Sequence, residues 1–395
     1  MKRFLFILAS LIIWIIFLAP FTIICASGET EKPEKVYSVI YVQKPNDWYI
    51  KQAALWREEI DKNPKDPDAW YNYYNAVRYA RFVETIKTQE KKEKLQDIVR
   101  QMGEAIPETF EYYYLKYKTH HDIRDIEDLE KAYALAPERH ETYSDFVGYY
   151  EIHNNPEKMS EFLLKWYDSQ DIASSLLNYN YNVLMSTDEN PILFTNGDND
   201  TYPIWMLQIV KGVRQDVTVL NASLMMADEK YLIRKLGEKK IKIDFNKLPA
   251  YRTNDFLPAL VKYIGQDYPQ VPVYLAATLW KNYIEPLKEN LYLTGLAYKF
   301  SPERIDNIAL IKRNLEHHFR LDYLIYDWYE ERFLATALMP NLNMNYTPAI
   351  IILSEHYKLS GMNDKSSAWK DIALKIAEKG GMKERVLQDL KSKGL

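Results

Sequence analysis

The sequence predicts a protein of mixed α and α/β class, in which helical hairpins flank a small domain built on a parallel β-sheet. Apolar and aromatic residues recur at three- and four-residue intervals, with breaks at prolines, over residues 46–187. A strand, a turn, a helix, a glycine and a second strand then follow one another within residues 191–220. A second helical pair follows Pro340. We therefore expect four segments: 1–27, 28–187, 188–340 and 341–395.

The composition is that of a globular protein with more than one folding unit. The chain has 395 residues, 47% of them hydrophobic, which is enough apolar material for more than one core. Its 51 basic residues nearly balance its 55 acidic ones. A nucleic-acid partner is therefore not expected, because there is no broad positive field to bind phosphates. Cys25 is the single cysteine, so residues 28–395 hold no disulfide and no thiolate metal site.

The first segment predicts export. Two basic residues precede an uncharged run from Phe4 to Ala26, as in a secretory signal peptide. The same 23 residues could remain as a membrane anchor, since they can span about 30 Å of hydrocarbon. Pro20 and the small residues near the end favour cleavage. Lipidation of Cys25 is disfavoured because Ile24 stands where a lipoprotein signal has a small residue. We expect a periplasmic protein, or one anchored in the membrane and facing the periplasm.

Residues 28–187 have the spacing of a helical-hairpin repeat. Inward-facing residues are expected on two successive helices after Pro137: Tyr143, Phe146, Val147, Tyr150, Met159, Leu163 and Trp166. This pattern resembles the tetratricopeptide repeat, a helical hairpin of about 34 residues closed by proline. Tyr113 and Val147 stand where that repeat has small residues, so we expect degenerate, TPR-like repeats. Stacked hairpins present a concave surface that can bind a partner.

Two features of residues 28–187 each allow two interpretations. Its many tyrosines are expected to pack between helices, although they could also line a peptide or glycan groove. The tyrosines concerned are Tyr71, Tyr73, Tyr74, Tyr79, Tyr112, Tyr113, Tyr114 and Tyr117. The β-branched stretch Val36 to Val42 predicts either a short strand or an extended linker.

A strand–helix–strand unit opens the third segment. The apolar runs 192–195 and 217–220 enclose the amphipathic stretch 202–211, which ends at Gly212. This order predicts two parallel strands joined by a right-handed crossover. Further strands are expected in residues 271–276 and within 291–300, and alternating residues 241–245 predict an edge strand. We expect a small Rossmann-like sheet flanked by helices.

The turn after the first strand contains the candidate site residues: Asn196, Asp198, Asn199, Asp200 and Thr201. Ligands of open α/β sheets bind at the carboxyl ends of the strands. The oxygen atoms of this turn suit a hard cation such as Ca²⁺ or Mg²⁺. The residue types favour a purely structural role, in which Asp200 or Thr201 caps the helix and Pro203 occupies its first turn. No cofactor other than such a cation is expected.

Motifs of several enzyme classes are missing from the sequence. The turn has one glycine where a dinucleotide-binding loop needs three, and no phosphate-loop lysine follows. Neither a Gly-x-Ser-x-Gly nor a His-Glu-x-x-His motif occurs. The two adjacent histidine pairs, at 120–121 and 317–318, point about 100° apart on a helix and make no metal-binding face. We therefore predict no catalytic residues.

The third segment resembles a known family through a run of residues that begins at Ile192 and ends at Pro203. Later blocks agree in the same order: Trp205, Gln208, 212–214, 216–217, 271–276, 295–302 and 357–358. Together they resemble the soluble C-terminal domain of bacterial, multi-spanning, protein O-mannosyltransferase-like glycosyltransferases. The resemblance covers about residues 188–390. It implies a stand-alone relative of the exported domain joined to helical repeats. Transferase activity is not implied, because in that family the chemistry is expected in the transmembrane half.

These observations predict an exported, non-enzymatic scaffold of the bacterial cell envelope, whose partner is another envelope protein or a membrane complex. The alternative is a ligand-, metal- or glycan-binding auxiliary module of a glycosyltransferase system. That module would use the turn that contains Asp198 and Asp200.

Overall fold

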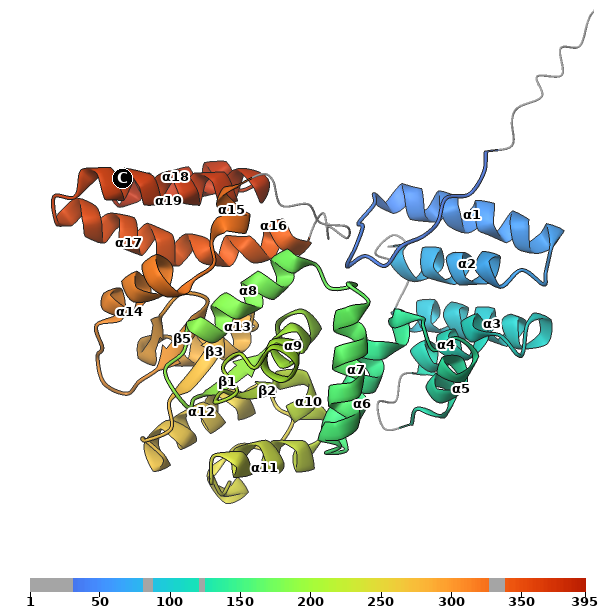
Figure 1. Ribbon diagram of the computed structural model, residues 1–395, viewed down its shortest axis with the longest axis horizontal. Helices are drawn as coiled ribbons and strands as arrows, with labels where there is room; N and C mark the ends of the chain where they lie inside the picture. The colour runs from blue at the N-terminus through green and yellow to red at the C-terminus, as the bar shows by residue number, and fades with distance from the viewer. Residues whose placement is uncertain (1–30, 81–87, 121–124, 327–337) are drawn as a thin grey trace, which may run out of the picture.

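The computed structural model describes residues 31–80, 88–120, 125–326 and 338–395. Helical hairpins of the N-terminal half lie on one side of the molecule, a small sheet lies next to them, and the C-terminal helices lie above the sheet (Figure 1). The expected signal or anchor, 1–27, lies outside the described residues. None of the helices in the described ranges has both the length and the apolar character needed to cross a bilayer.

Helices α1 to α8 build the N-terminal half. Their bounds are α1 Asn46–Lys62, α2 Pro67–Tyr79, α3 Thr88–Ala105, α4 Phe110–His120, α5 Glu127–Leu135, α6 Tyr143–Ile152, α7 Pro156–Asp168 and α8 Ser174–Met185. Hairpins form between α1 and α2, between α4 and α5, and between α6 and α7. Asp66 begins α2 by accepting hydrogen bonds from the amides of Asp68 and Ala69, and Pro67 takes the first position. The predicted helical hairpins are confirmed.

The aromatic residues of these hairpins pack as predicted. Phe146 and Leu163 are at most 2% exposed and lie at the interface of α6 and α7. The hydroxyl of buried Tyr74 lies 2.8 Å from that of Thr119, and Tyr114 donates to the carbonyl of Glu141 at 3.0 Å. Both of these hydroxyls thus have a partner, which lets the two large rings fill the space between helices.

The stretch Val36 to Val42 forms no strand. It is a linker that is extended at first and then turns at residues 39–41, and we call residues 36–45 the N-terminal strap. Its backbone is held by side chains of helices instead of by a neighbouring strand: the amide of Val36 donates to Asn72 at 2.7 Å. Tyr41 donates to Asp171 at 2.5 Å, which ties the strap to the segment after α7.

The central sheet has five strands in the order β2-β1-β3-β5-β4. Their bounds are β1 Ile192–Thr195, β2 Thr218–Asn221, β3 Val273–Ala276, β4 Leu291–Leu293 and β5 Ala297–Phe300. β1 pairs in parallel with β2 and β3, and Ile192 lies opposite Thr218 and Val273. The predicted parallel pair is confirmed. β5 is antiparallel to both β3 and β4, so the sheet is mixed and the expectation of a wholly parallel sheet is wrong.

Two local features explain where the strand predictions failed. Residues 291–300 form a hairpin instead of one strand, because Gly295 adopts a φ of +146° that turns the chain back. Residues 241–245 form no edge strand. There the hydroxyls of Tyr263 and Tyr268 donate to the carbonyl of Lys242, so side chains take up the hydrogen bonds that a neighbouring strand would have made.

Short helices connect the strands and follow the last of them. They are α9 Tyr202–Lys211, α10 Ala222–Ala227, α11 Glu229–Glu238, α12 Phe256–Asp267, α13 Lys281–Ile284, α14 Asn307–Arg313 and α15 Asp322–Ile325. Gly212 ends α9 with a φ of +67°. Helix α9 packs against α7 and α8, so the last N-terminal hairpin lies directly on the crossover helix of the sheet.

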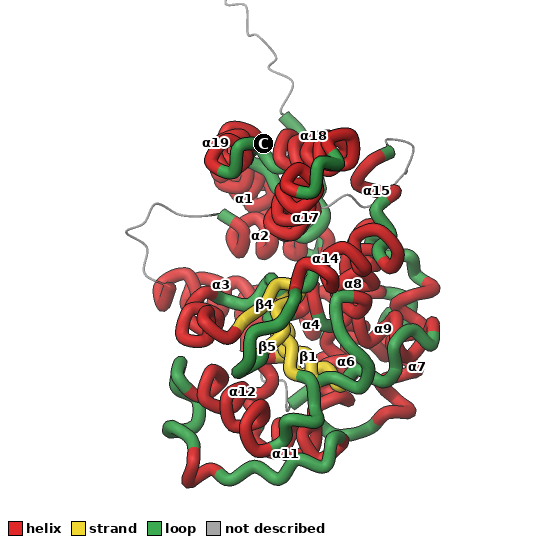
Figure 2. The backbone as a smooth tube through the Cα atoms, turned by 90° about the vertical axis from the view of Figure 1, so that its left-hand side faces the viewer, coloured by secondary structure: helices red, strands yellow, loops and turns green. Residues whose placement is uncertain are grey.

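The C-terminal helices are α16 Leu338–Asn343, α17 Thr347–Leu359, α18 Asn363–Lys379 and α19 Lys383–Ser392. α17 and α18 form the expected hairpin, in which buried Ser354 donates to the carbonyl of Ser366 at 2.8 Å. Figure 2 shows this hairpin above the strands. Asn182 of α8 joins it to the centre by donating to the carbonyl of Arg320 and to the hydroxyl of Tyr346.

Candidate functional site

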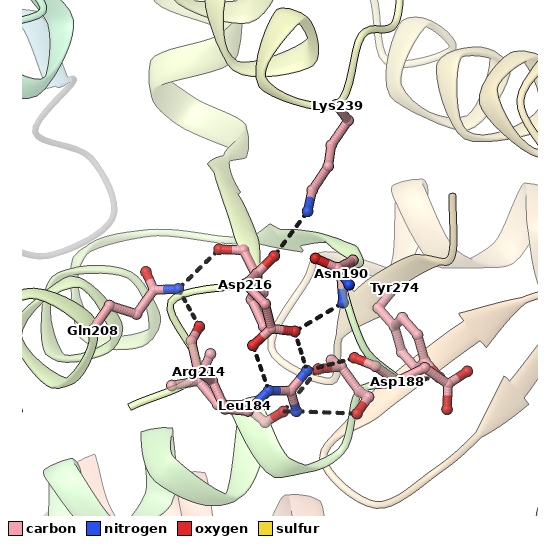
Figure 3. A network of polar contacts seen from close by, with 10 residues as sticks. Leu184, Asp188, Asn190, Gln208, Arg214, Asp216, Lys239 and Tyr274 are labelled. Atoms are coloured by element: carbon pink, nitrogen blue, oxygen red, sulfur yellow. Dashed lines mark hydrogen bonds and ion pairs between the residues drawn. The ribbon is translucent and has the colours of Figure 1, made fainter. Parts of the chain in front are cut away.

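The amino ends of the parallel strands are held by Arg214 (Figure 3). Its guanidinium donates to both carboxylate oxygens of Asp216 at 2.8 and 2.9 Å. It also donates to the carbonyls of Leu184 at 3.0 Å, of Thr187 at 3.2 Å and of Asp188. One side chain thus connects the end of α8, the approach to β1 and the approach to β2.

Neighbouring residues complete this amino-end network. Asp216 accepts a further bond from the amide of Asn190 at 2.8 Å, and Gln208 donates to the carbonyls of Arg214 and Val217. Hydrogen bonds from Arg214 lower the pKa of Asp216 to about 2. Gln208, Arg214 and Asp216 carry the family resemblance, and the structure shows that they hold the fold at the end of the sheet away from the candidate turn.

The candidate turn lies at the opposite, carboxyl end. It leaves β1 and forms a short 3₁₀ turn, Asp198–Asp200, before α9. The carboxylate of Asp200 folds back and accepts hydrogen bonds from the amides of Asn196 and Gly197, each at 2.8 Å. It also accepts one from the hydroxyl of Thr278, which follows β3. Asp200 therefore joins the loops after β1 and β3.

Burial distinguishes the residues of this turn. Asp200 is 3% exposed, and this burial raises the pKa of its carboxyl group. Thr201 is fully buried and contacts the hydroxyl of Thr195 at 2.7 Å and the amide of Asn221 at 2.9 Å. Its hydroxyl therefore does not cap α9, and the carboxylate of Asp200 does not cap it either, so the expectation that one of these two side chains caps the helix is wrong. Asp198 is exposed.

The strand order creates a crevice at this edge. The chain leaves β1 through α9 toward β2 on one side, whereas β3 lies on the other side of β1. Loops that diverge in this way leave space between the carboxyl ends of adjacent parallel strands, which is where open α/β sheets bind ligands. A cavity of about 930 Å³ occupies this position, and Asn196, Asp200 and Thr278 line its floor.

The helical half of the chain closes this cavity from the other side, and we call the whole space the switch-point cleft. Its described walls also include strap residues Ile40 and Lys44, Tyr49 of α1, and Arg78 near the end of α2. Helix α16 adds a further wall. Three parts of the chain that are distant in sequence thus surround one space of the size typical for small-molecule sites.

The side chains of the cleft floor include two amides from the candidate turn. No hydrogen bond is found for the side chains of Asn196 or Asn199 within the described ranges, although both residues line the cleft. Each amide offers donors and an acceptor. Of the predicted residues, Asn196, Asn199 and Asp200 therefore lie at the cleft and Thr201 lies behind it. Asp198 lines a smaller neighbouring cavity of about 140 Å³.

The described residues contain no cluster of metal-binding side chains for the expected cation. Within the residues that the structure describes, no group of three or more His, Cys, Asp or Glu side chains could hold a metal ion. Binding of Ca²⁺ or Mg²⁺ by the turn stays a prediction.

Sequence reasoning missed Thr278 and Arg78. Thr278 directly follows the predicted strand 271–276, so the rule that ligands bind at the carboxyl ends of strands could have found it. Arg78 had no such signal, because only the packing of the hairpins on the sheet brings α2 to this edge.

A second polar cluster fastens the strap beside the cleft. The carboxylate of Asp171 accepts hydrogen bonds from Tyr41 at 2.5 Å and from the indole of Trp166 at 2.9 Å. The imidazole of His140 lies 3.2 Å from it. The nearby carboxylate of Asp171 raises the pKa of His140, although burial of the imidazole opposes this. Glu141 also raises this pKa and Arg139 lowers it.

We expect His140 to stabilise the protein more at pH 6 than at pH 8. Because the pKa of His140 is higher in the folded chain, its contribution is complete below the unfolded value of about 6.5 and is lost as the pH rises through the folded value. The measurement is the free energy of unfolding of wild type and His140→Gln at both pH values. A difference between the two proteins that grows with pH would contradict this role.

Comparison with known proteins agrees with the resemblance over part of the chain. Residues 176–240 match the family model of TMEM260-associated domain 2. TMEM260 is an O-mannosyltransferase-like protein. The matched segment contains β1, the Asp200 turn, α9 and β2, together with Arg214 and Asp216. This part of the protein is therefore similar to a domain associated with an O-mannosyltransferase-like protein.

The other comparisons give little further information. No curated protein matches the chain. Among solved structures, the crystal structure of the yeast Tom70 is similar over 90% of this chain, with 11% sequence identity and a TM-score of 0.27. The chain spans 62% of that protein's length in the match.

Proposed function

We propose that this chain is a non-catalytic binding module of a glycan-transfer system, and that it holds a saccharide in the switch-point cleft. The observation that carries the proposal is the place of the cleft, where the loops after β1 and β3 diverge. The similarity of residues 176–240 to a TMEM260-associated domain supports the link to glycan transfer.

The cleft lining suits a saccharide. Asn196 and Asn199 present amides that can donate to and accept from sugar hydroxyls. Tyr49 and Tyr79 add two aromatic rings, whose centroids lie 5.9 Å apart at a tilt of 59°. Most of the other residues that line the cleft are polar too, which suits a ligand with many hydroxyl groups.

A protein partner is the second candidate, and the helical hairpins favour it. Stacked hairpins leave a continuous surface on which another protein can bind. In this proposal the chain is exported, and it works in the periplasm or from a membrane anchor within 1–27 as a scaffold for an envelope protein or membrane complex. The two candidates are compatible, since the cleft and the outer faces of the hairpins are different surfaces.

Filling the cleft should abolish saccharide binding. Gly197 lines the cleft, its φ of −158° is extended backbone open to any residue, and an added Cβ would meet nothing within 4 Å. Gly197→Trp should therefore fold and place an indole in the ligand space. Isothermal titration calorimetry with a panel of methyl glycosides and short oligosaccharides should show at least about a tenfold loss of affinity relative to wild type, which is about 1.4 kcal/mol.

The control substitutes another glycine. Gly237 lies exposed in α11, away from the cleft lining, and also has open space around its Cα. Gly237→Trp should leave the affinity unchanged. If both variants bind the panel as wild type does, or if wild type binds no saccharide, the proposed function is wrong.

A further inference from the structure

We propose that the saccharide held in the cleft carries an anionic group, a carboxylate or a phosphate, and that Arg78 binds it. This inference rests on the proposed function and adds the chemistry of the ligand. Arg78 is partly buried and lines the cleft. Among the described residues, no carboxylate lies within ion-pair distance of its guanidinium, and its one ring contact is to Tyr79 at 5.6 Å.

Among the described residues, four other partly buried arginines form ion pairs, whereas Arg313 forms none. Arg139 forms ion pairs with Glu111 at 2.9 Å and with Glu141 at 2.7 Å. Arg214 pairs with Asp216. The guanidinium of Arg78 has lost part of its water shell without such a partner among the described residues, and the carboxylate of Asp145 acts on it only from beyond ion-pair distance. Its position in the last turn of α2 complements the helix dipole. The helix dipole does not explain why the charge of Arg78 faces the cleft. An anionic ligand in the cleft explains it.

A second cation makes this wall of the cleft basic. Lys44 of the strap also lines the cleft, and it too has no carboxylate within ion-pair distance among the described residues. The nearest aromatic group to its ammonium is the ring of Trp48, at 5.7 Å. Guanidinium and ammonium groups bind carboxylates and phosphates through short, charge-assisted hydrogen bonds.

The opposite wall has different chemistry and sets the orientation of the ligand. There Asp200 offers no positive charge to an anion, while Asn196 and Asn199 offer neutral amides to hydroxyl groups. The anion of the ligand therefore lies toward α2, and its sugar hydroxyls lie toward the loop after β1. An inorganic anion would occupy only the basic wall. A saccharide that carries an anion uses both walls.

The test is a titration of three proteins with four probes. Glucose, glucuronate, glucose 1-phosphate and inorganic phosphate are titrated calorimetrically into wild type, Arg78→Gln and Arg100→Gln. Arg100 is an exposed arginine paired with Asp97 and Glu104, outside the cleft lining, and serves as the matched control. Wild type should bind glucuronate or glucose 1-phosphate at least about tenfold more tightly than glucose. Arg78→Gln should remove this preference, and Arg100→Gln should keep it.

Several outcomes separate this inference from the proposed function. Because Arg78 makes no ion pair with the residues that the structure describes, Arg78→Gln should unfold at the wild-type temperature or above it without ligand, which excludes misfolding as the cause. If wild type prefers neutral glucose, or if Arg78→Gln keeps the preference for the anion, the inference is overturned and the cleft remains a saccharide site. Equal affinity for inorganic phosphate and glucose 1-phosphate would also overturn it. If no sugar binds, both proposals fail.

Discussion

Replacing Arg214 with alanine should lower the free energy of unfolding by about 1.5–3 kcal/mol, the range for hydrogen bonds to a charged group, because the pair with Asp216 is partly buried. The substitution removes hydrogen bonds to Asp216 and to three backbone carbonyls near β1. It leaves the carboxylate of Asp216 without its principal partner. Urea unfolding followed by circular dichroism measures the loss.

Two further substitutions test whether the planar geometry of the Arg214 guanidinium accounts for this loss of stability. Arg214→Lys keeps the charge but lacks the planar fork, so it should recover only part of the stability. Arg100→Ala removes exposed ion pairs and should change the free energy of unfolding by about 0.5 kcal/mol or less. Equal losses for Arg214→Ala and Arg100→Ala would show that the amino-end network does not hold the sheet.

The same network predicts an acid dependence. The pKa of Asp216 is lowered to about 2 in the folded chain. Its stabilising contribution is therefore present above the unfolded value of about 3.9 and is lost as the pH falls through about 2. The difference in stability between wild type and Arg214→Ala should accordingly shrink as the pH falls below about 4.

Gly295→Ala should lower the free energy of unfolding by about 2–4 kcal/mol, because it combines backbone strain with overpacking. The φ of Gly295 is +146°, which residues with a Cβ rarely adopt. An added Cβ would lie 2.5 Å from Cζ of Phe319 and 3.0 Å from the hydroxyl of Ser186. Neighbouring Thr294 and Leu296 hydrogen-bond to Ser186, so the turn has little room to move.

Gly237→Ala is the matched control for this substitution. Gly237 lies in α11 with open space around it, and alanine favours the helix over glycine by about 0.5–1 kcal/mol. Thermal unfolding should therefore show a lower midpoint for Gly295→Ala and an unchanged or higher midpoint for Gly237→Ala. A wild-type midpoint for Gly295→Ala would mean that the hairpin can shift away from α8.

Local sequence patterns correctly predicted two kinds of element. These are the helical hairpins, whose hydrogen bonds are local, and the parallel pair of β1 and β2, which a short crossover joins. Prolines and apolar spacing located the hairpins around Phe146 and Ser354, and Gly212 marked the end of α9. The run at Ile192 and the run at Val219 were correctly predicted to be parallel. Residues 241–245 were mispredicted because alternation of apolar residues does not reveal that tyrosines from another helix will satisfy the backbone.

Part of the candidate site was also predicted from the sequence. The turn from Asn196 to Thr201 was identified as the carboxyl edge of a strand, and Asn196, Asn199 and Asp200 do line the cleft. The residue types alone could not show which side-chain oxygen atoms face the cleft. Asp198, Asp200 and Thr201 are polar residues of the same turn, yet they differ in burial.

The amino-acid sequence by itself determined the helical hairpins, the parallel pair and the polar turn between β1 and α9, since these depend on residues that are near one another in the chain. Only the tertiary structure decided that the sheet is mixed and that Arg214 joins three segments at one end of it. It also decided that α2 and the strap close a cleft at the other end, which places Arg78 opposite the turn. The physical reason is that contacts between distant segments depend on how whole faces pack, and no local spacing records them.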